Sequence, residues 1–212
     1  MTGVAHTAPN WEKTFTATTA DQTSALALRL AGLLEAGDLL VLSGELGAGK
    51  TTFTQGLGEG LGVRAGIISP TFVLVRIHPN LPDGPRPGGP DLVHVDAYRL
   101  GSAAEIDDID LENTMDSSVT VVEWGRDRVE HLSESRLEID LHRAVGLAGS
   151  GHVSGAGAGA PSAAGAPSAA GALPETLDFD EDETDEPRTI VMRGYEPPWQ
   201  AAPDQDPAEG NH

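Results

Sequence analysis

Residues 41–62, VLSGELGAGKTTFTQGLGEGLG, contain the strongest structural signal in the chain. The apolar run that follows Asp38 is typical of a strand buried on both faces of a parallel sheet. It leads into a glycine-rich turn, a lysine and two threonines that open a helix. The spacing GELGAGKT, residues 44–51, fits G-x-x-x-x-G-K-[ST], the pattern of a phosphate-binding loop between a strand and a helix.

Each residue type in this loop suits a chemical task. We expect the backbone N–H groups of Gly47, Ala48, Gly49 and Lys50 to surround a β-phosphate, with the helix dipole behind them. Glycine is needed because a Cβ would obstruct the tight turn and the close approach of the phosphate. Lys50 would reach the β- and γ-phosphates, and the Thr51 hydroxyl would bind Mg²⁺. Lysine occurs only at positions 13 and 50, so a chance match is rare.

Two carboxylates follow apolar strands elsewhere in the chain. Asp96 comes after DLVHV and Glu123 after SSVTVV. Ligands of open α/β sheets gather at the carboxyl ends of the strands. A phosphate-loop enzyme needs a carboxylate there to hold Mg²⁺ and to orient the attacking group. Both residues are therefore candidates for catalysis and metal binding, and a helix cap or solvated strand end is the alternative for each.

The identity of the nucleotide follows from an absence. Ras-like GTPases read guanine with an Asn-Lys-x-Asp element, which the lysines at positions 13 and 50 cannot form. ATP is therefore the expected nucleotide, together with Mg²⁺ as its metal.

Composition limits the remaining function classes. The 212 residues carry a formal net charge of -20, which repels phosphate backbones, so we expect no direct contact with DNA or RNA. The chain has no cysteine and no run near the ~18 apolar residues of a membrane span. The first residues do not resemble a signal peptide. We expect a soluble cytoplasmic protein that does not contact membranes.

The order of elements predicts an α/β fold, a P-loop NTPase-like three-layer sandwich with a mostly parallel central sheet and antiparallel additions. Thr19 is the expected N-cap of the first helix. The ATPase domain is assigned to residues 1–143. Strands are expected near 13–16, 38–44, 67–78, 91–100, 117–125 and 135–143, the last with one solvent-exposed face, and helices over 21–36, from 50 to a glycine within 56–62, over 102–115 and over 125–132.

Residues 144–187 differ from the rest in composition. They begin with an Ala, Gly, Ser and Pro tract and end with PETLDFDEDETDEP, which carries eight carboxylates and no cation. Such a segment cannot bury enough apolar surface to offset its chain entropy, so we interpret it as a disordered insertion. The apolar RTIVMRG that follows favours a last strand near 188–193, paired with the strand at 135–143. The alternative is a fold that ends at Arg143. Residues 196–212 are expected to be a disordered tail, unless Trp199 docks back.

Four motifs together resemble the TsaE (YjeE) family of small P-loop ATPases. They are GELGAGKTT (44–52), SPTFVLV (69–75), HVDAYRL (94–100) and VVEWG (121–125), and their order and approximate spacing match that family. The likeness covers about residues 14–143 and the strand near 188–193. The loop at 79–90 and the insertion lie outside it, and Phe72 stands where many members have tyrosine.

The resemblance implies roles for individual residues. Asp96 corresponds to the residue needed for hydrolysis, Glu123 to a metal-side carboxylate, and residues 69–71 to a loop that responds to nucleotide state. His94 would orient Asp96 or pack inertly, and Trp124 would anchor the core or an interface, the core being favoured. The candidate nucleotide ligands are Gly44, Leu46, Gly47, Ala48, Gly49, Lys50, Thr51 and Thr52, with Thr19 on the adenine side. The candidate metal ligands are Thr51, Asp96 and Glu123, and the candidate catalytic residues are Lys50, Asp96 and Glu123.

Family resemblance also implies a function. Members hydrolyse ATP slowly alone and act with the TsaB and TsaD proteins, which hold the tRNA and attach a threonylcarbamoyl group to the adenosine beside the anticodon. We therefore expect a Mg²⁺-dependent ATPase that meets tRNA only through these partners. A small-molecule P-loop kinase and a non-hydrolytic, nucleotide-gated scaffold are the alternatives.

Overall fold

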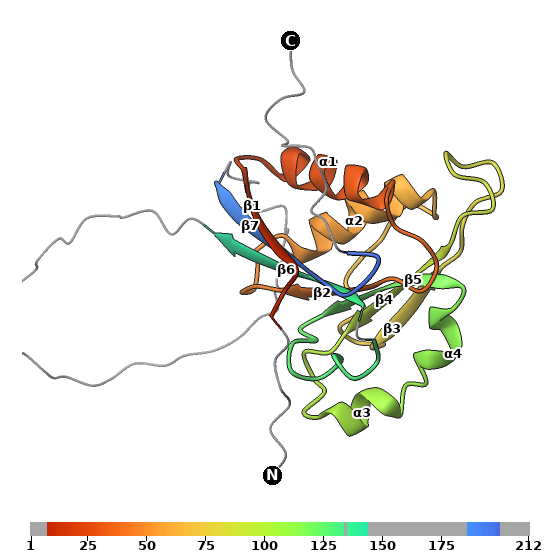
Figure 1. The fold of residues 1–212 in the computed structure, drawn as a ribbon. Helices are drawn as coiled ribbons and strands as arrows, with labels where there is room; N and C mark the ends of the chain where they lie inside the picture. The colour runs from red at the N-terminus through yellow and green to blue at the C-terminus, as the bar shows by residue number, and fades with distance from the viewer. Residues whose placement is uncertain (1–7, 134, 144–185, 200–212) are drawn as a thin grey trace, which may run out of the picture. The chain divides into compact units, whose positions relative to one another are not determined.

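The computed structural model describes residues 8–133, 135–143 and 186–199, which form one sheet covered by helices (Figure 1). Within these residues the seven strands lie in the order β1-β7-β6-β2-β5-β4-β3. The strands are β1 (Trp11–Ala17), β2 (Leu39–Ser43), β3 (Val75–His78), β4 (Asp91–Asp96), β5 (Ser118–Glu123), β6 (Arg136–Arg143) and β7 (Arg188–Tyr195). The helices are α1 (Ala20–Ala31), α2 (Lys50–Leu61), α3 (Ala103–Asp107) and α4 (Glu112–Met115).

The centre of the sheet is parallel and its margins are antiparallel. β2 pairs in parallel with β5 and β6, and β5 pairs in parallel with β4. β3 runs antiparallel to β4, β7 to β6, and β1 to β7. Helices α1 and α2 lie on one face and α3 and α4 on the other (Figure 1). This confirms the predicted α/β class with a mostly parallel sheet and antiparallel additions.

Strand β2 is buried on both faces, as its continuous apolar sequence predicts. Leu40 and Leu42 belong to the core beneath α1 and α2. Leu39 and Val41 belong to the core on the face of α3 and α4. The strand therefore anchors the start of the glycine-rich loop from both sides.

Helix α2 contains three glycines and still runs to Leu61, with Gly62 (φ 73°) as its C-cap. The glycines allow α1 to approach. A Cβ on Gly56 would lie 2.2 Å from the carbonyl oxygen of Ser24, and one on Gly60 would lie 2.6 Å from that of Leu28. The helix therefore ends at Gly62, the last glycine of the predicted range. Gly56 and Gly60 lie inside the helix, where the absence of a Cβ lets α1 pack closely.

The strand predicted after the insertion is present and extends to Tyr195. β7 pairs with β6 along its whole length: Arg188 lies opposite Arg143, and Tyr195 lies opposite Arg136. β1 pairs with the other edge of β7. A fold that ends at Arg143 is therefore wrong. The predicted disordered insertion falls almost wholly on residues 144–185, which lie outside the described residues, so that interpretation stays a prediction.

The predicted tail boundary at residue 196 needs correction. Trp199 is buried in the core with α1, and its carbonyl oxygen accepts a hydrogen bond from Trp11 Nε1 at 2.9 Å. The ordered chain therefore includes residues 196–199. The tail prediction for 200–212 concerns residues that the structure does not describe.

Three local predictions were wrong. Helix α1 ends at Ala31, five residues before the predicted Ala36, because the chain turns at Gly32. Residues 126–133 form turns in place of a helix, and Asp127 has a φ of 63°, which an α-helix cannot accommodate. Residues 67–74 are not a strand, and Leu74 has a φ of 66°. In the last two cases a left-handed residue interrupts the predicted element.

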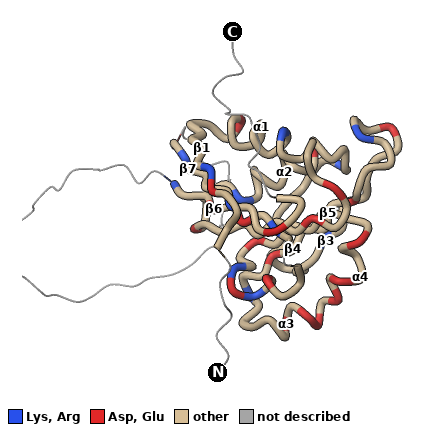
Figure 2. Tube along the Cα trace, viewed as in Figure 1, with Lys and Arg blue, Asp and Glu red and all other residues tan. Residues whose placement is uncertain are grey.

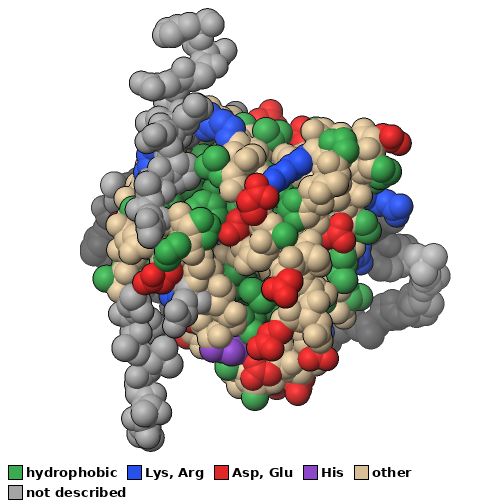
Figure 3. Space-filling view, turned by 45° about the vertical axis from the view of Figure 1, so that its right-hand side comes forward, with side chains coloured by type: hydrophobic (Ala, Val, Ile, Leu, Met, Phe, Trp, Pro, Cys, Tyr) green, Lys and Arg blue, Asp and Glu red, His purple; other side chains and the backbone are tan. Residues whose placement is uncertain are grey.

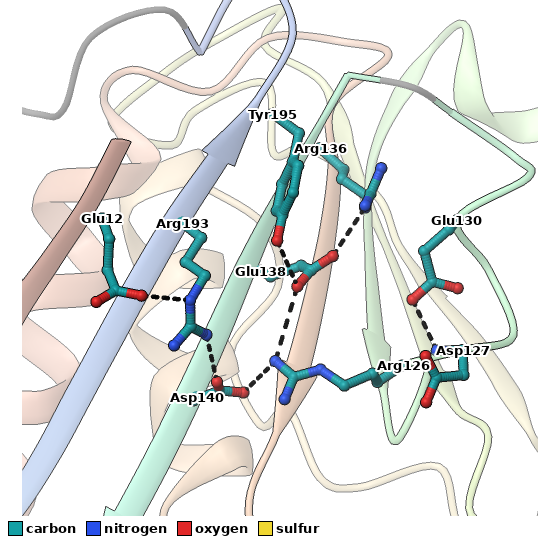
Figure 4. A network of polar contacts seen from close by, with 9 residues as sticks. All are labelled: Glu12, Arg126, Asp127, Glu130, Arg136, Glu138, Asp140, Arg193 and Tyr195. Atoms are coloured by element: carbon teal, nitrogen blue, oxygen red, sulfur yellow. Dashed lines mark hydrogen bonds and ion pairs between the residues drawn. The ribbon is translucent and has the colours of Figure 1, made fainter. Parts of the chain in front are cut away.

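Strand β6 was predicted to have one solvent-exposed face, but it is buried on both through Leu141. Its polar face is covered by an ion-pair network (Figure 4). Asp140 accepts hydrogen bonds from Arg126 and Arg193, and Arg193 also pairs with Glu12 at 2.6 Å. A buried carboxylate is tolerated when it is paired in this way.

Glu138 is the second buried carboxylate of the network. It accepts hydrogen bonds from the Tyr195 hydroxyl at 3.1 Å and from Arg136 Nε at 3.0 Å. Arg126, at the start of the 126–133 segment, also lies 3.8 Å from Glu138 Oε2.

None of the helices in the described part of the chain has the length and apolar character required to cross a membrane.

Two buried histidines lie side by side on β3 and β4, and one of them predicts a pH effect. The rings of His78 and His94 are 6.5 Å apart, and burial, followed by the charges of His94 and Arg76, lowers the pKa of His78. The folded chain thus holds this proton less tightly than the unfolded chain. Stability from this group is complete above the unfolded pKa of about 6.5 and is lost as pH falls toward the lower folded value.

We therefore expect the His78→Gln variant to lose less free energy of unfolding than the wild type between pH 7.5 and pH 5.5. Urea unfolding at both values measures this difference, and carboxylates that titrate equally in both proteins cancel. The same loss in variant and wild type would contradict the assignment.

Candidate nucleotide site

The glycine-rich loop has the backbone shape that its sequence predicts. Gly44 has a φ of 150°, and a Cβ there would lie 2.4 Å from the carbonyl oxygen of Leu141. Gly49 (φ 97°) caps α2 with no side-chain hydrogen bond, so the first N–H groups of the helix are left for a ligand. Ala48 is buried and anchors the loop, whereas Leu46 is 88% exposed at its tip.

Lys50 is held under the loop. Its Nζ donates hydrogen bonds to the carbonyl oxygens of Gly44 at 2.8 Å and Glu45 at 3.0 Å, and it lies 4.1 Å from the ring centroid of Trp124. Burial lowers the pKa of the ammonium, although the nearby carboxylates of Glu123, Asp96 and Glu45 act in the opposite direction. The result is a partly desolvated cation, which a polyphosphate would stabilise.

A cavity of about 550 Å³ opens above the loop. One wall comes from the loop and the first turn of α2 and consists of Leu46, Gly47, Gly49, Lys50, Thr51 and Thr52. The remaining lining residues come from strand ends and loops and are Ser69, Thr71, Asp96, Tyr98, Glu123, Trp124 and Arg188. Lys50, Thr51 and both predicted carboxylates therefore share one cavity.

The two carboxylates are neighbours because Asp96 and Glu123 are register partners at the ends of β4 and β5. Their surroundings differ. Asp96 Oδ2 accepts hydrogen bonds from Thr71 at 2.6 Å and Ser69 at 3.0 Å, and Oδ1 accepts one from the Tyr98 N–H at 2.9 Å. Asp96 therefore ties the 69–71 loop to the sheet.

Glu123 is held by a histidine instead. His94 Nε2 lies 2.9 Å from Glu123 Oε1, and both side chains are buried. The expectation that His94 either orients Asp96 or packs inertly is thus wrong, because the ring reaches across to the neighbouring strand. The sequence could not show this, since it depends on the pairing of β4 with β5.

Trp124 is not a core residue, contrary to the favoured prediction. It has a φ of 62°, which turns the chain just after β5. Its ring covers Lys50 and packs against Tyr98 with centroids 5.3 Å apart. Nearby, the Arg99 guanidinium lies over the exposed Phe72 ring at 5.1 Å. Of these residues, Trp124 and Tyr98 line the cavity together with Asp96 and Glu123.

Arg188 is a site residue that the sequence analysis missed. Its Nε is buried and has no hydrogen-bond partner among the described residues, and it lies 3.3 Å from where a Cβ on Gly49 would be. It belongs to β7, on the opposite side of β2 from β4 and β5. Its only signal in the sequence is that it begins the strand that pairs with 135–143.

Thr19 does not line the cavity. Its hydroxyl accepts a hydrogen bond from the Gln22 N–H at 3.1 Å, which confirms it as the N-cap of α1. Gly44 and Ala48 also do not line the cavity and support the loop from below. No three His, Asp or Glu side chains converge on a metal position in the described ranges. Thr51 and one or both carboxylates fit a Mg²⁺ that keeps waters and phosphate oxygens as its other ligands.

The sheet is mostly parallel, and its central strand leads through a glycine-rich loop into a helix. A lysine and two carboxylates line the cavity beside this loop. These features place the protein in the P-loop NTPase-like fold class. A sequence model described as threonylcarbamoyl adenosine biosynthesis protein TsaE matches residues 17–146, more than half of the chain. The chain belongs to the TsaE family.

Curated relatives agree with this assignment. A TsaE protein from Streptomyces coelicolor is 61% identical over 122 residues, which cover 57% of this chain and 79% of that relative. A TsaE protein from Bacillus subtilis is 40% identical over 125 residues, covering 58% and 73%. A crystal structure of Bacillus subtilis YdiB matches with a TM-score of 0.54 and 25% identity over 88% of this chain and 87% of that one.

Proposed function

We propose that this protein is a Mg²⁺-dependent ATPase that acts with TsaB and TsaD in forming threonylcarbamoyladenosine on tRNA. The pathway is supported by the relatives, which are named tRNA threonylcarbamoyladenosine biosynthesis proteins. The observation that carries the ATPase proposal is the single cavity that joins the glycine-rich loop and Lys50 to Asp96 and Glu123.

In this proposal each group has a task. The N–H groups at the start of α2 would bind the β-phosphate, and Lys50 would neutralise charge that develops on the γ-phosphate. Asp96 would place the attacking water, while Thr51 and Glu123 would hold the metal. Mg²⁺, when bound, supplies positive charge at the phosphate oxygens. Trp124 and Tyr98 restrict access of bulk water from the rim.

The sheet order separates the charged residues that line the cavity. The carboxylates stand on β4 and β5, on one side of β2, and Arg188 stands on β7, on the other side. We therefore infer that the γ-phosphate would bind near Asp96 and Glu123, and that Arg188 would contact the α-phosphate or the nucleoside. This arrangement gives Arg188 a binding task separate from hydrolysis.

We expect Arg188→Gln to weaken nucleotide binding by about 10-fold, the size of one charge-assisted hydrogen bond, with little effect on turnover at saturation. Arg64→Gln, which changes an exposed arginine outside the cavity, serves as the control. Calorimetry gives the dissociation constants. Equal affinities for the two variants would remove Arg188 from the site.

Charge distribution supports an indirect contact with tRNA. Residues 102–116, which contain α3 and α4, carry six carboxylates and no lysine or arginine, and Figure 2 shows acidic positions along this segment. Acidic side chains also predominate over basic ones on the face in Figure 3. A surface of this sign repels a phosphate backbone, so partner proteins must hold the tRNA.

The deciding experiment measures ATP hydrolysis by the full chain alone, with TsaB, with TsaD and with both. We expect slow hydrolysis alone and stimulation by the pair together. Labelled γ-phosphate recovered on a small metabolite would favour a kinase. Repeated rounds of tRNA modification with a non-hydrolysable analogue would favour a scaffold. Absence of nucleotide binding under all conditions would refute the proposal.

A further inference from the structure

His94 lies directly beneath the candidate site and has no access to solvent. It belongs to β4, and its ring reaches the side chain at the end of β5, where Nε2 is 2.9 Å from Glu123 Oε1. A fully buried polar ring is costly unless it makes hydrogen bonds. This contact is therefore the one that accounts for a histidine here.

The direction of the hydrogen bond follows from the partner. An ionised carboxylate only accepts, so Nε2 carries the hydrogen and donates it. The other ring nitrogen, Nδ1, has no hydrogen-bond partner within the described residues. The orientation of the His94 ring is therefore fixed by its hydrogen bond to Glu123.

The same contact sets the orientation of Glu123. The hydrogen bond between the Glu123 side chain and the described residues is the one that joins Oε1 to His94, and Oε2 takes no part in it. Glu123 lines the cavity together with Lys50 and Thr51. With Oε1 tied to the ring behind it, the carboxylate has one oxygen left for a ligand in the cavity.

We propose that His94 is a positioning residue for Glu123: its Nε2–H fixes the carboxylate so that Oε2 faces the metal that accompanies the nucleotide phosphates. This inference rests on the proposed function. A histidine that orients a metal-binding carboxylate typically contributes about 10- to 100-fold in metal affinity or activity. His94 affects the site through Glu123 and touches neither nucleotide nor metal.

The test compares three substitutions at one position. In His94→Gln the amide nitrogen stands near the place of Nε2 and can still donate to Glu123. In His94→Asn the shorter amide cannot reach that place, and in His94→Leu the donor is absent. His78→Leu is the matched control, because His78 is a buried histidine on the adjacent strand whose ring is 6.5 Å from that of His94 and makes no contact with Glu123.

ADP affinity is measured for each variant by calorimetry in EDTA and again in Mg²⁺. We expect His94→Leu and His94→Asn to keep the wild-type affinity in EDTA and to lose about 10-fold of the gain that Mg²⁺ provides. His94→Gln should retain most of that gain, and His78→Leu all of it. The Glu123→Gln variant lacks the second carboxylate oxygen. In that variant, substitution of His94 should cause no further loss of the gain in ADP affinity that Mg²⁺ provides.

The outcomes separate this inference from the proposed function. A full Mg²⁺-dependent gain in both His94→Asn and His94→Leu would overturn the positioning role while leaving the nucleotide site intact. Wild-type protein that binds no ADP in EDTA or in Mg²⁺ would overturn both. If His94→Leu does not fold, the His94→Asn and His94→Gln pair decides, and equal gains in the two would overturn the inference.

Discussion

Lys50→Ala is expected to lower nucleotide affinity by at least about 100-fold and to abolish ATP hydrolysis, both alone and with TsaB and TsaD. Lys50 lines the cavity beside the glycine-rich loop, and its side chain is buried. Alanine leaves the loop without the charge that a γ-phosphate needs. Arginine cannot replace it, because a planar guanidinium does not fit where a compact ammonium fits.

The same substitution should not unfold the protein. Burial is the main influence on the Lys50 ammonium, and it disfavours the charged form, so removal of the charge also removes that cost. We expect the free energy of unfolding from urea titration to be no lower than in the wild type. Lys13→Ala changes the only other lysine and is the control. Normal stimulation of the Lys50→Ala variant by the partner proteins would refute the role of the loop.

Asp96→Asn is expected to slow ATP turnover by about 100-fold while leaving nucleotide binding largely unchanged. Asparagine keeps the shape of the side chain and an oxygen for the Tyr98 N–H, but it has no charge with which to orient and polarise water. Asp96→Ala should give the same separation of binding from turnover. Single-turnover hydrolysis and ADP titration measure the two effects independently. Loss of ADP binding in the asparagine variant would show that Asp96 is structural.

Asp96 also holds Ser69 and Thr71, so its two tasks must be distinguished. Thr71→Val removes the 2.6 Å hydrogen bond to Asp96 and leaves the carboxylate in place. If Asp96 acts on water, Thr71→Val should retain most of the turnover that Asp96→Asn loses. Equal losses in both variants would mean that Asp96 acts by anchoring the 69–71 loop.

The parts of the site that could be predicted from sequence are those with local causes. The loop from Gly44 to Thr51 requires glycines at positive φ values and a lysine at a fixed sequence spacing from them. Both requirements can be recognised in eight consecutive residues. The carboxylates were found by a rule of comparable simplicity, since the ends of parallel strands meet at one edge. The structure places Lys50, Asp96 and Glu123 in one cavity for these reasons.

The parts that could not be predicted depend on residues distant in the chain. Arg188 reaches the loop because β7 pairs with β6 across a separation of more than 40 residues. His94 meets Glu123 because of the register of β4 and β5. The local sequence of residues 126–133 predicts a helix, but the segment forms turns, and Arg126 forms ion pairs with the buried carboxylates of β6. None of these partners can be identified from the local sequence pattern.

The sequence was sufficient to predict the fold class, the glycine-rich loop and the edge of the sheet where the candidate site lies, because these follow from hydrophobic periodicity and from backbone angles that only glycine adopts easily. Tertiary structure alone decided which neighbour each polar side chain meets. It assigned His94 to Glu123, the 69–71 loop to Asp96 and Trp124 to Lys50. Buried polar groups must find hydrogen-bond partners, and strand pairing determines which partners are within reach.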